Sequence, residues 1–158
     1  MTDLTFASMA GMIGAPLGTS SWHEVTQDAV NEFAHCTGDS QWIHTDVERA
    51  RRESPFGGPV AHGYLTLSLL SAMAMEIGVV PAGTAAALNY GLDKVRFLAP
   101  VPVGARLRLT SKLTGFDRKP NGQYLMKTEN TMEIEGSDRP ALLAESLAIL
   151  VPGPEAET

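Results

Sequence analysis

Two side chains in the first third of the chain, Asp39 and His44, have the types and the spacing that acid–base chemistry needs. A carboxylate and an imidazole can hold one water molecule between them and share the transfer of its protons. Gly38 sits where a helix C-terminal glycine belongs, so Asp39 is predicted to lie in a loop just past a helix end. Taken alone, Asp39 could be an ordinary turn residue and His44 an ordinary partly buried histidine.

An apolar run at 60–80 begins directly after a loop rich in glycine and proline. Its pattern predicts a long helix over about 62–76, ended by Gly78. Free N–H groups and the positive dipole end at a helix N-terminus can hold a developing negative charge. Gly63 lies at this helix start, and its lack of a side chain lets a carbonyl group approach the backbone closely. His62 precedes it, and we expect it to shape the turn as a cap or through a hydrogen bond.

Hydrophobic periodicity predicts the elements that position these residues. Thr26 is expected to cap a helix over 27–36, and Thr45 and Glu48 fit a capping box for a short helix that ends near Glu53. Alternation of polar and apolar residues predicts strands over 22–25, 92–98, 106–114, 123–135 and 142–151, with a hairpin turn at 119–122. The last strand is apolar on both faces, so we place it centrally. The order predicts an α+β domain, in which an antiparallel sheet curves around one buried helix.

The 158 residues fit a single domain, with its core expected over about 20–151. Residues 1–20 show no clear period and are predicted as loop, and the tail at 152–158 is predicted to be disordered. Cys36 is the one cysteine of the sequence, so no internal disulfide can form, which suits a reducing cytoplasm. The N-terminal stretch lacks the basic residues with which a secretory signal peptide begins.

The net charge of −6 argues against a nucleic-acid or anionic-membrane partner, since both need clustered Lys and Arg. The run at 60–80 approaches the length of a membrane-spanning helix. However, it contains His62, Ser68 and Glu76 and has no basic flanks, so we expect the protein's own core to bury it. No His or Cys pair has the spacing that zinc ligands usually show. We therefore expect no metal and no cofactor.

Three segments together resemble one known family. They are the pair Asp39-x4-His44, the segment SPFGGPVAHG at 54–63, and the segment NYGLDKVRFLAPVPVG at 89–104. The combination is similar to the MaoC-like hydratases, also called (R)-specific enoyl-CoA hydratases, and to their NodN-like subgroup. The resemblance covers roughly residues 20–150.

This resemblance implies a hotdog fold, in which an antiparallel sheet wraps around a long central helix, and a homodimer. It implies reversible syn addition of water to a trans-2-enoyl thioester, which gives an (R)-3-hydroxyacyl thioester. The substrate would be an acyl-CoA or an acyl-carrier-protein thioester. The family's catalytic Asp and His match Asp39 and His44, and the backbone N–H that polarises the thioester carbonyl matches Gly63.

Three further residues are expected near the substrate, namely Gln41, His62 and Ser71. Ser71 matches a serine that lies near the catalytic pair in relatives, but it could equally satisfy a helix carbonyl. Many relatives carry Asn-Pro where this chain has Gln41 and Trp42. Gln41 can still donate and accept hydrogen bonds. The departure leaves the reaction type standing and puts the length of the acyl chain in doubt.

Other functions stay open on the same scaffold. The first is a polyketide or secondary-metabolite dehydratase that acts on a carrier-protein-bound substrate. The second is a non-catalytic acyl-thioester-binding subunit, against which the presence of both Asp39 and His44 speaks. A thioesterase is a weaker third. Lys94 and Arg96, on the strand face turned away from the core, could meet the phosphates of coenzyme A, although solvated or ion-paired roles are commoner for such residues.

Overall fold

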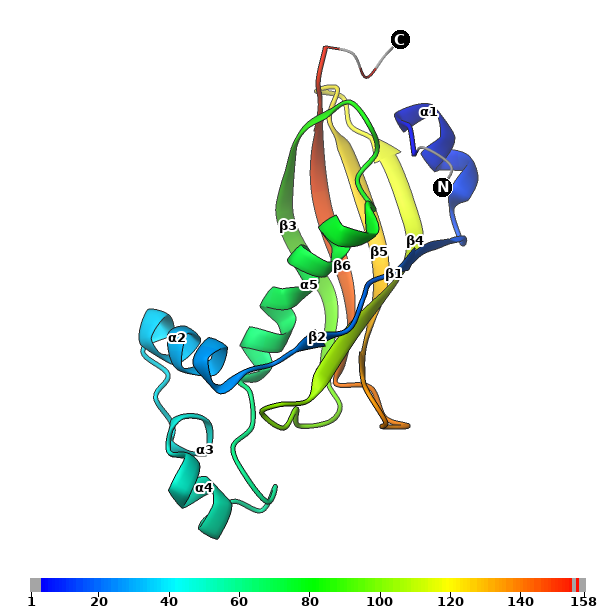
Figure 1. Ribbon diagram of the computed structural model, residues 1–158. Helices are drawn as coiled ribbons and strands as arrows, with labels where there is room; N and C mark the ends of the chain where they lie inside the picture. The colour runs from blue at the N-terminus through cyan, green and yellow to red at the C-terminus, as the bar shows by residue number, and fades with distance from the viewer. Residues whose placement is uncertain (1–3, 155, 157–158) are drawn as a thin grey trace.

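The computed structural model describes residues 4–154 and 156 of the chain (Figure 1). Its helices are α1 (Phe6–Met9), the 3-10 helix η1 (Ala10–Met12), α2 (Gln27–Thr37), α3 (Trp42–Thr45), α4 (Val47–Glu53) and α5 (Gly63–Ile77). Its strands are β1 (Pro16–Thr19), β2 (His23–Glu24), β3 (Thr84–Phe97), β4 (Arg106–Arg118), β5 (Tyr124–Ile134) and β6 (Leu142–Pro152). Among these residues, no helix is long and apolar enough to cross a membrane.

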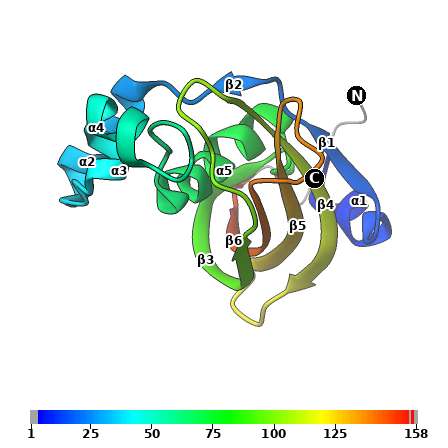
Figure 2. The ribbon, with the colours of Figure 1, turned by 90° about the horizontal axis from the view of Figure 1, so that it is seen from below.

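The strands form one antiparallel sheet in the order β1-β4-β5-β6-β3, and β2 pairs with β4. The sheet curls around α5, which lies in its opening (Figure 2). The predicted α+β class and curved sheet are thus confirmed. So is the central place of β6, which lies between β5 and β3. Strand β3 begins eight residues before the predicted start at 92, and it occupies the free edge of the sheet.

One face of α5 forms the core with the concave side of the sheet. Leu65, Leu70 and Met73 are buried on this face. They belong to a cluster with four fully buried sheet side chains, Leu107, Leu109, Met132 and Leu142. The opposite face of α5 is open, since Tyr64 is 70% exposed and Met75 is 64% exposed. The expectation that the protein's own core buries this helix therefore holds for one face only in the single chain.

Residues 1–3 of the predicted loop at 1–20 lie outside the described part of the chain, and for the rest the prediction is wrong, because α1, η1 and β1 form there. Thr5 caps α1 through a capping box. Phe6 and Met9 are buried in a second apolar cluster, which includes Leu113 and Phe116 of the C-terminal half of β4. In β1, Gly18 has φ +146°, and a Cβ there would lie 2.7 Å from the Ile77 side chain of α5. Glycine is therefore required where this edge strand crosses the helix.

Two further boundaries differ from the prediction. The expected capping box of Thr45 and Glu48 is absent, and Asp46 caps α4 instead by accepting a hydrogen bond from the Arg49 N–H at 3.0 Å. The shorter aspartate side chain suits the N-cap, while Thr45 ends the separate helix α3.

In the tail, Gly153 N–H donates to Gly83 O at 2.7 Å, and residues 155, 157 and 158 lie outside the described part of the chain.

Candidate active site

Asp39 lies in the loop directly after α2, as predicted. Helix α2 starts at its N-cap Thr26 and ends at Gly38, whose φ of 82° places it in the left-handed region that glycine adopts without strain. The Asp39 N–H donates to Thr37 Oγ1 at 3.3 Å. The backbone carbonyl of Asp39 accepts a hydrogen bond from His62 Nε2 at 2.8 Å. The backbone of Asp39 is thereby held by two hydrogen bonds, and its exposed carboxylate makes no hydrogen bond among the described residues.

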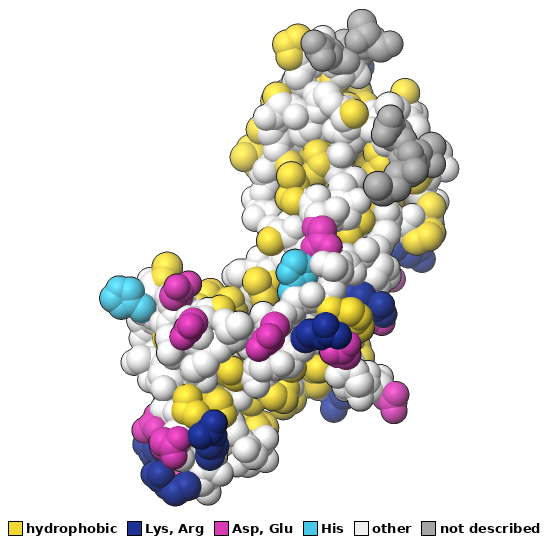
Figure 3. Space-filling model, in the orientation of Figure 1, with side chains coloured by type: hydrophobic (Ala, Val, Ile, Leu, Met, Phe, Trp, Pro, Cys, Tyr) yellow, Lys and Arg dark blue, Asp and Glu magenta, His cyan; other side chains and the backbone are white. Residues whose placement is uncertain are grey.

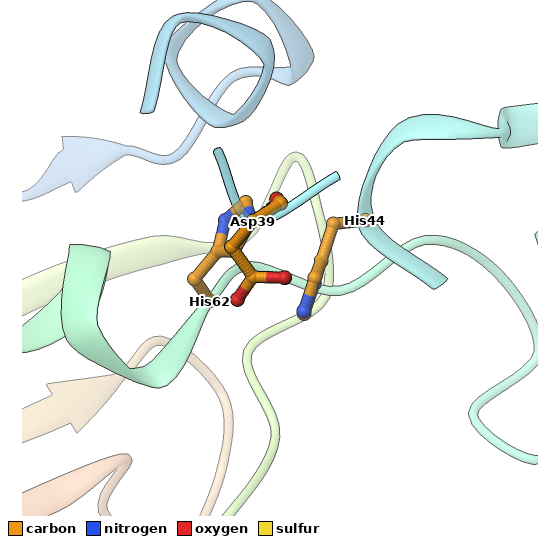
Figure 4. Close-up of side chains that lie close together, drawn as sticks. All are labelled: Asp39, His44 and His62. Atoms are coloured by element: carbon orange, nitrogen blue, oxygen red, sulfur yellow. The ribbon is translucent and has the colours of Figure 1, made fainter. Parts of the chain in front are cut away.

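His44 lies on α3 and is 8% exposed. Its Nδ1 lies 2.6 Å from the backbone carbonyl oxygen of Val60. A carbonyl oxygen can only accept, so Nδ1 carries a proton and the Nε2 of the neutral ring presents its lone pair. Gln27 Nε2 also donates to the His44 carbonyl at 2.8 Å and ties α3 to α2. The ring is therefore fixed with its basic nitrogen turned toward Asp39 (Figure 4).

His62 supports both of these residues. Its ring stacks on that of His44, with centroids 3.9 Å apart, and Phe33 lies against it at 5.1 Å. It occupies the N-cap position of α5 but makes no side-chain capping hydrogen bond. Its bond to the Asp39 carbonyl instead joins the helix start to the Asp39 loop. Of the two roles expected for His62, the turn-shaping hydrogen bond is present and the cap is not.

Asp39, His44 and His62 each offer one potential metal-ligand atom, and these atoms lie within 4.8 Å of one another. Sequence spacing did not reveal this cluster. Two nitrogens are engaged by carbonyl oxygens, His44 Nδ1 and His62 Nε2. The stacked rings are inclined by 28°, so the lone pairs in their planes run side by side instead of converging on one ion. This geometry suits proton transfer better than tetrahedral zinc binding.

Gly63 opens α5, and the first helical hydrogen bond runs from Thr66 N–H to His62 O at 3.1 Å. The preceding N–H groups of the helix have no intrahelical acceptor, as at any helix start. A pocket of about 230 Å³ lies beside Gly63 and is lined by Phe97 and Val101 among others. A Cβ at Gly63 would meet the Phe97 ring at 3.2 Å. The absence of a side chain therefore keeps the backbone accessible from this pocket.

The structure does not bring Gln41 or Ser71 into the cluster of Asp39, His44 and His62. Gln41 precedes α3, and its backbone carbonyl accepts the N–H of His44 at 3.0 Å. Its exposed side chain makes no hydrogen bond among the described residues. Gln41 thus helps to place His44 through its backbone.

Ser71 lies two turns along α5 from Gly63. Its neighbour Ser68 donates to the Tyr64 carbonyl at 2.7 Å, whereas within the described part of the chain Ser71 makes no such bond. It lines two adjoining hollows of about 180 and 310 Å³ between α5 and β3. We call these hollows the α5–β3 groove, and their shared lining residues are Leu70, Ser71, Asn89, Ser146 and Leu147.

Comparison with known proteins decides the family. The profile of the MaoC-like domain matches residues 8–135. The chain belongs to the MaoC-like dehydratase family. It is 48% identical over 141 residues to 3-hydroxyacyl-thioester dehydratase Z of Mycobacterium tuberculosis, with 89% of this chain and 92% of that protein covered. It is 43% identical over 150 residues to nodulation protein N of Rhizobium leguminosarum bv. viciae, with 95% and 93% covered, which confirms the NodN-like kinship.

Solved structures agree with this assignment. The crystal structure of a monoamine oxidase regulatory protein from Archaeoglobus fulgius superposes with a TM-score of 0.79 and 25% identity, with 96% of each chain covered. The antiparallel sheet wrapped around α5 is thus the hotdog fold of MaoC-like proteins. As a MaoC-like dehydratase, the chain is an enzyme of the hydro-lyase class, which adds or removes water.

Proposed function

We propose that this MaoC-like dehydratase is an (R)-specific enoyl-CoA hydratase, which reversibly adds water to a trans-2-enoyl thioester. The observation that supports the proposal is the proximity of the Asp39 carboxylate to the ring of the buried His44, whose Nδ1 is engaged by Val60 O, beside the N–H groups that open α5. The mycobacterial relative is named as a 3-hydroxyacyl-thioester dehydratase, and dehydration of a 3-hydroxyacyl thioester is the reverse of the proposed hydration.

The thioester carbonyl would accept a hydrogen bond from the Gly63 N–H. Addition at the β-carbon pushes the π electrons of the double bond toward this carbonyl oxygen, which becomes enolate-like. A preorganised backbone donor at such an oxygen contributes on the order of 3–4 kcal/mol. The positive dipole end of α5, a helix of 15 residues, adds to this stabilisation.

Asp39 and His44 would hold the attacking water between them. Asp39 accepts one water hydrogen and orients the oxygen toward the β-carbon, while His44 Nε2 removes the other proton as the C–O bond forms. The imidazolium keeps its Nδ1–H bond to the Val60 carbonyl and then returns the proton from Nε2 to the α-carbon. The oxygen and the proton thus reach the same face of the substrate, as syn addition requires.

Purified protein is expected to hydrate crotonyl-CoA to the (R)-3-hydroxy product, followed by the loss of enoyl thioester absorbance and by chiral chromatography. Asp39→Asn and His44→Gln should each lower kcat by about 10²–10⁴-fold and keep the circular dichroism of the wild type. His35→Ala, in an exposed histidine of α2, is the control and should retain full turnover. Wild-type rates in both site variants would refute the assignment.

The same assay run with matched coenzyme A and carrier-protein thioesters separates the two substrate classes. A kcat/KM that favours the carrier-protein form would point to a dehydratase of polyketide or secondary metabolism. Equal or better use of the coenzyme A form would support the hydratase. Thiol release without hydration would instead indicate a thioesterase.

We also propose that the enzyme works in the cytoplasm, because its single cysteine cannot form an internal disulfide.

We further propose that two chains pair through β3. Strand β3 spans 14 residues and has one free edge. Of the nine large hydrophobic side chains that are exposed in the described part of the chain, six lie on α5 or β3: Tyr64, Met75, Leu88, Tyr90, Leu92 and Phe97. An edge strand flanked by such a patch favours association with a second copy.

A further inference from the structure

The α5–β3 groove has an unusual composition for a place that would hold a plain alkyl chain. It is largely apolar, and no charged residue lines either of its hollows. Its lining includes Met75, Leu88, Tyr90 and Leu92 of the patch proposed for pairing, so a second copy would roof the groove. Ser71 and Asn89 nevertheless lie on its two sides, and Thr128 and Ser146 form part of its floor. On the face drawn in Figure 3, charged side chains gather over the lower part of the molecule, and the described part of the upper surface is mainly uncharged.

The groove lies where the acyl part of a bound thioester would extend, a step that rests on the proposed function. Ser71 is eight residues along α5 from Gly63, which is about 12 Å of helix axis. The groove continues from Ser71 toward Met75 and Val79, away from Asp39 and His44. It therefore contacts the acyl chain beyond the double bond and takes no part in the addition of water.

The floor carries a closed triangle of polar side chains. Asn130 Nδ2 donates to Thr128 Oγ1 at 2.9 Å and to Ser146 Oγ at 2.6 Å. The two hydroxyls lie 3.0 Å apart. Asn130 Nδ2 also lies 3.2 Å from the Thr128 backbone carbonyl oxygen. Because that oxygen can only accept, it fixes which end of the Asn130 amide faces the hydroxyls.

Counting hydrogens in this triangle leaves one proton over. The Asn130 amide has two hydrogens for three nearby acceptors, and between the two hydroxyls one donates its proton to the other. The hydroxyl that receives it still carries its own proton, which makes no hydrogen bond among the described residues; Asn130 Oδ1 is likewise buried without a partner there. Thr128 is only 6% exposed, so an unpaired donor there is costly. Both hydroxyls line the groove, so an acceptor that enters the groove would complete the network.

We propose that the α5–β3 groove selects acyl chains that carry a hydrogen-bond-accepting oxygen beyond the double bond. The Thr128–Ser146 pair donates its spare proton to this oxygen, while Ser71 lies exposed on the helix side of the groove. The favoured chemical class is an enoyl thioester with a distal hydroxyl, keto or ether oxygen. A site built to donate a hydrogen bond discriminates against the analogue that lacks the acceptor.

The wild-type enzyme tests this directly with an oxygen scan. A set of trans-2-enoyl-CoA thioesters of equal length has one distal methylene replaced by an ether oxygen, at a different position in each. At one position we expect kcat/KM to exceed that of the all-carbon parent by about tenfold, the scale of one hydrogen bond. At the other positions the parent should be the better substrate. If the all-carbon parent has the higher kcat/KM than the ether analogue at every oxygen position, the proposal is overturned.

Variants identify the donor. Ser146→Ala and Thr128→Val each leave one hydroxyl in place, so each should keep part of the oxygen preference. The double variant leaves none and should lose the preference at that position. Thr131→Val, on the same strand but half-buried on the opposite face, is the matched control and should keep it in full. Survival of the preference in a folded double variant would overturn the assignment of the donor.

Calorimetry separates this proposal from the proposed function. Saturated acyl-CoA thioesters with and without the ether oxygen are titrated into the wild type, which needs no turnover. Hydration without any oxygen preference in rates or binding overturns the groove proposal alone. Tighter binding of the ether form by a protein that hydrates nothing overturns the hydratase assignment and supports the groove.

Discussion

At the scale of single residues, His62 joins the parts of the site. It bonds the Asp39 carbonyl, stacks on the His44 ring and stands directly before Gly63. It touches no reacting atom in the proposed mechanism, so its role is to position. Because a misplacement of about 1 Å can cost on the order of 10² in rate, we expect this contact to influence turnover more than substrate binding.

His62→Phe should therefore lower kcat by about 10–100-fold with little change in KM, because phenylalanine keeps a ring over His44 and loses the hydrogen bond to Asp39. Steady-state kinetics with crotonyl-CoA measure both constants. Phe33→Leu, which alters packing on the same ring, serves as the control and should have the smaller effect on kcat. A variant with the wild-type kcat would show that the Asp39 loop needs no such support.

Gly63→Ala keeps the backbone N–H and adds one methyl group. That methyl would lie 3.2 Å from the Phe97 ring and on the side of the 230 Å³ pocket. We expect at least a tenfold loss of kcat/KM, because the methyl hinders approach of the thioester carbonyl to the N–H.

The double variant Gly63→Ala/Phe97→Leu distinguishes two causes of that loss. It relieves the contact between the new methyl group and the ring. Any melting temperature that Gly63→Ala loses through this contact should therefore return, whereas kcat/KM should stay low. Recovery of kcat/KM would mean that displacement of Phe97, and not the lost approach to the backbone, explains the effect of the single change.

The residues that act locally were predictable from the sequence. Gly38 ends α2 in the left-handed conformation and Thr26 caps it, because such signals need only a few neighbouring residues. The contact between His62 and the Asp39 carbonyl joins positions 23 residues apart. It depends on how two loops meet after folding, so no spacing rule could reveal it. The Val60 carbonyl that sets the tautomer of His44 escaped prediction for the same reason.

At the scale of elements, the C-terminal half of α5 is fastened to the β2 region by a glutamate. Glu76 accepts a hydrogen bond from the Ser21 N–H at 2.6 Å and meets His23 Nε2 at 2.5 Å. The hydrogen bond from Ser21 is the main cause that lowers the pKa of Glu76 to about 2, and His23 adds to it. Its charged form is thus favoured in the folded state.

A lowered folded-state pKa adds stability above the unfolded pKa, and this contribution disappears as the pH falls through the folded value. At neutral pH, Glu76→Gln should therefore unfold at a lower urea concentration than the wild type, and the gap should close as the pH falls from about 4.5 to about 2. Urea unfolding across this range measures it. Glu32→Gln, in an exposed residue of α2, is the control. A gap that stays constant with pH would contradict the linkage.

Element prediction succeeded where a segment's own pattern decided its structure. Polar and apolar residues alternate along β4 and β5, β6 is an apolar run, and Gly122, with φ 83°, turns the hairpin between β4 and β5. The start of β3 was missed because residues 84–87 are small and carry no alternation, and because residues 85–94 are exposed on both faces of the strand. Short helix α1 was missed because its burial comes from β4, which is distant in sequence.

At the scale of the whole molecule, the proposed pairing through β3 makes a simple prediction. Leu88→Glu places a charge on the exposed patch and should shift the protein from dimer to monomer in analytical ultracentrifugation. Ile13→Glu is the matched control, because Ile13 is 52% exposed against 54% for Leu88 but lies away from α5 and β3. For a dimer, the melting temperature of the wild type should also rise with protein concentration. Equal sedimentation of both variants as dimers would place the interface elsewhere.

The contiguity of the proposed catalytic segment has a consequence for how such enzymes diversify. Asp39, His44, His62 and Gly63 all fall within residues 39–63, whereas the floor of the α5–β3 groove is drawn from β5 and β6, near the other end of the chain. In the proposed scheme, the groups that carry reactivity and those that set substrate preference would therefore be encoded by separate stretches of the gene. Recombination between relatives could exchange one without disturbing the other, so a chimera with the first 63 residues of this chain should perform its chemistry on its partner's preferred acyl chains.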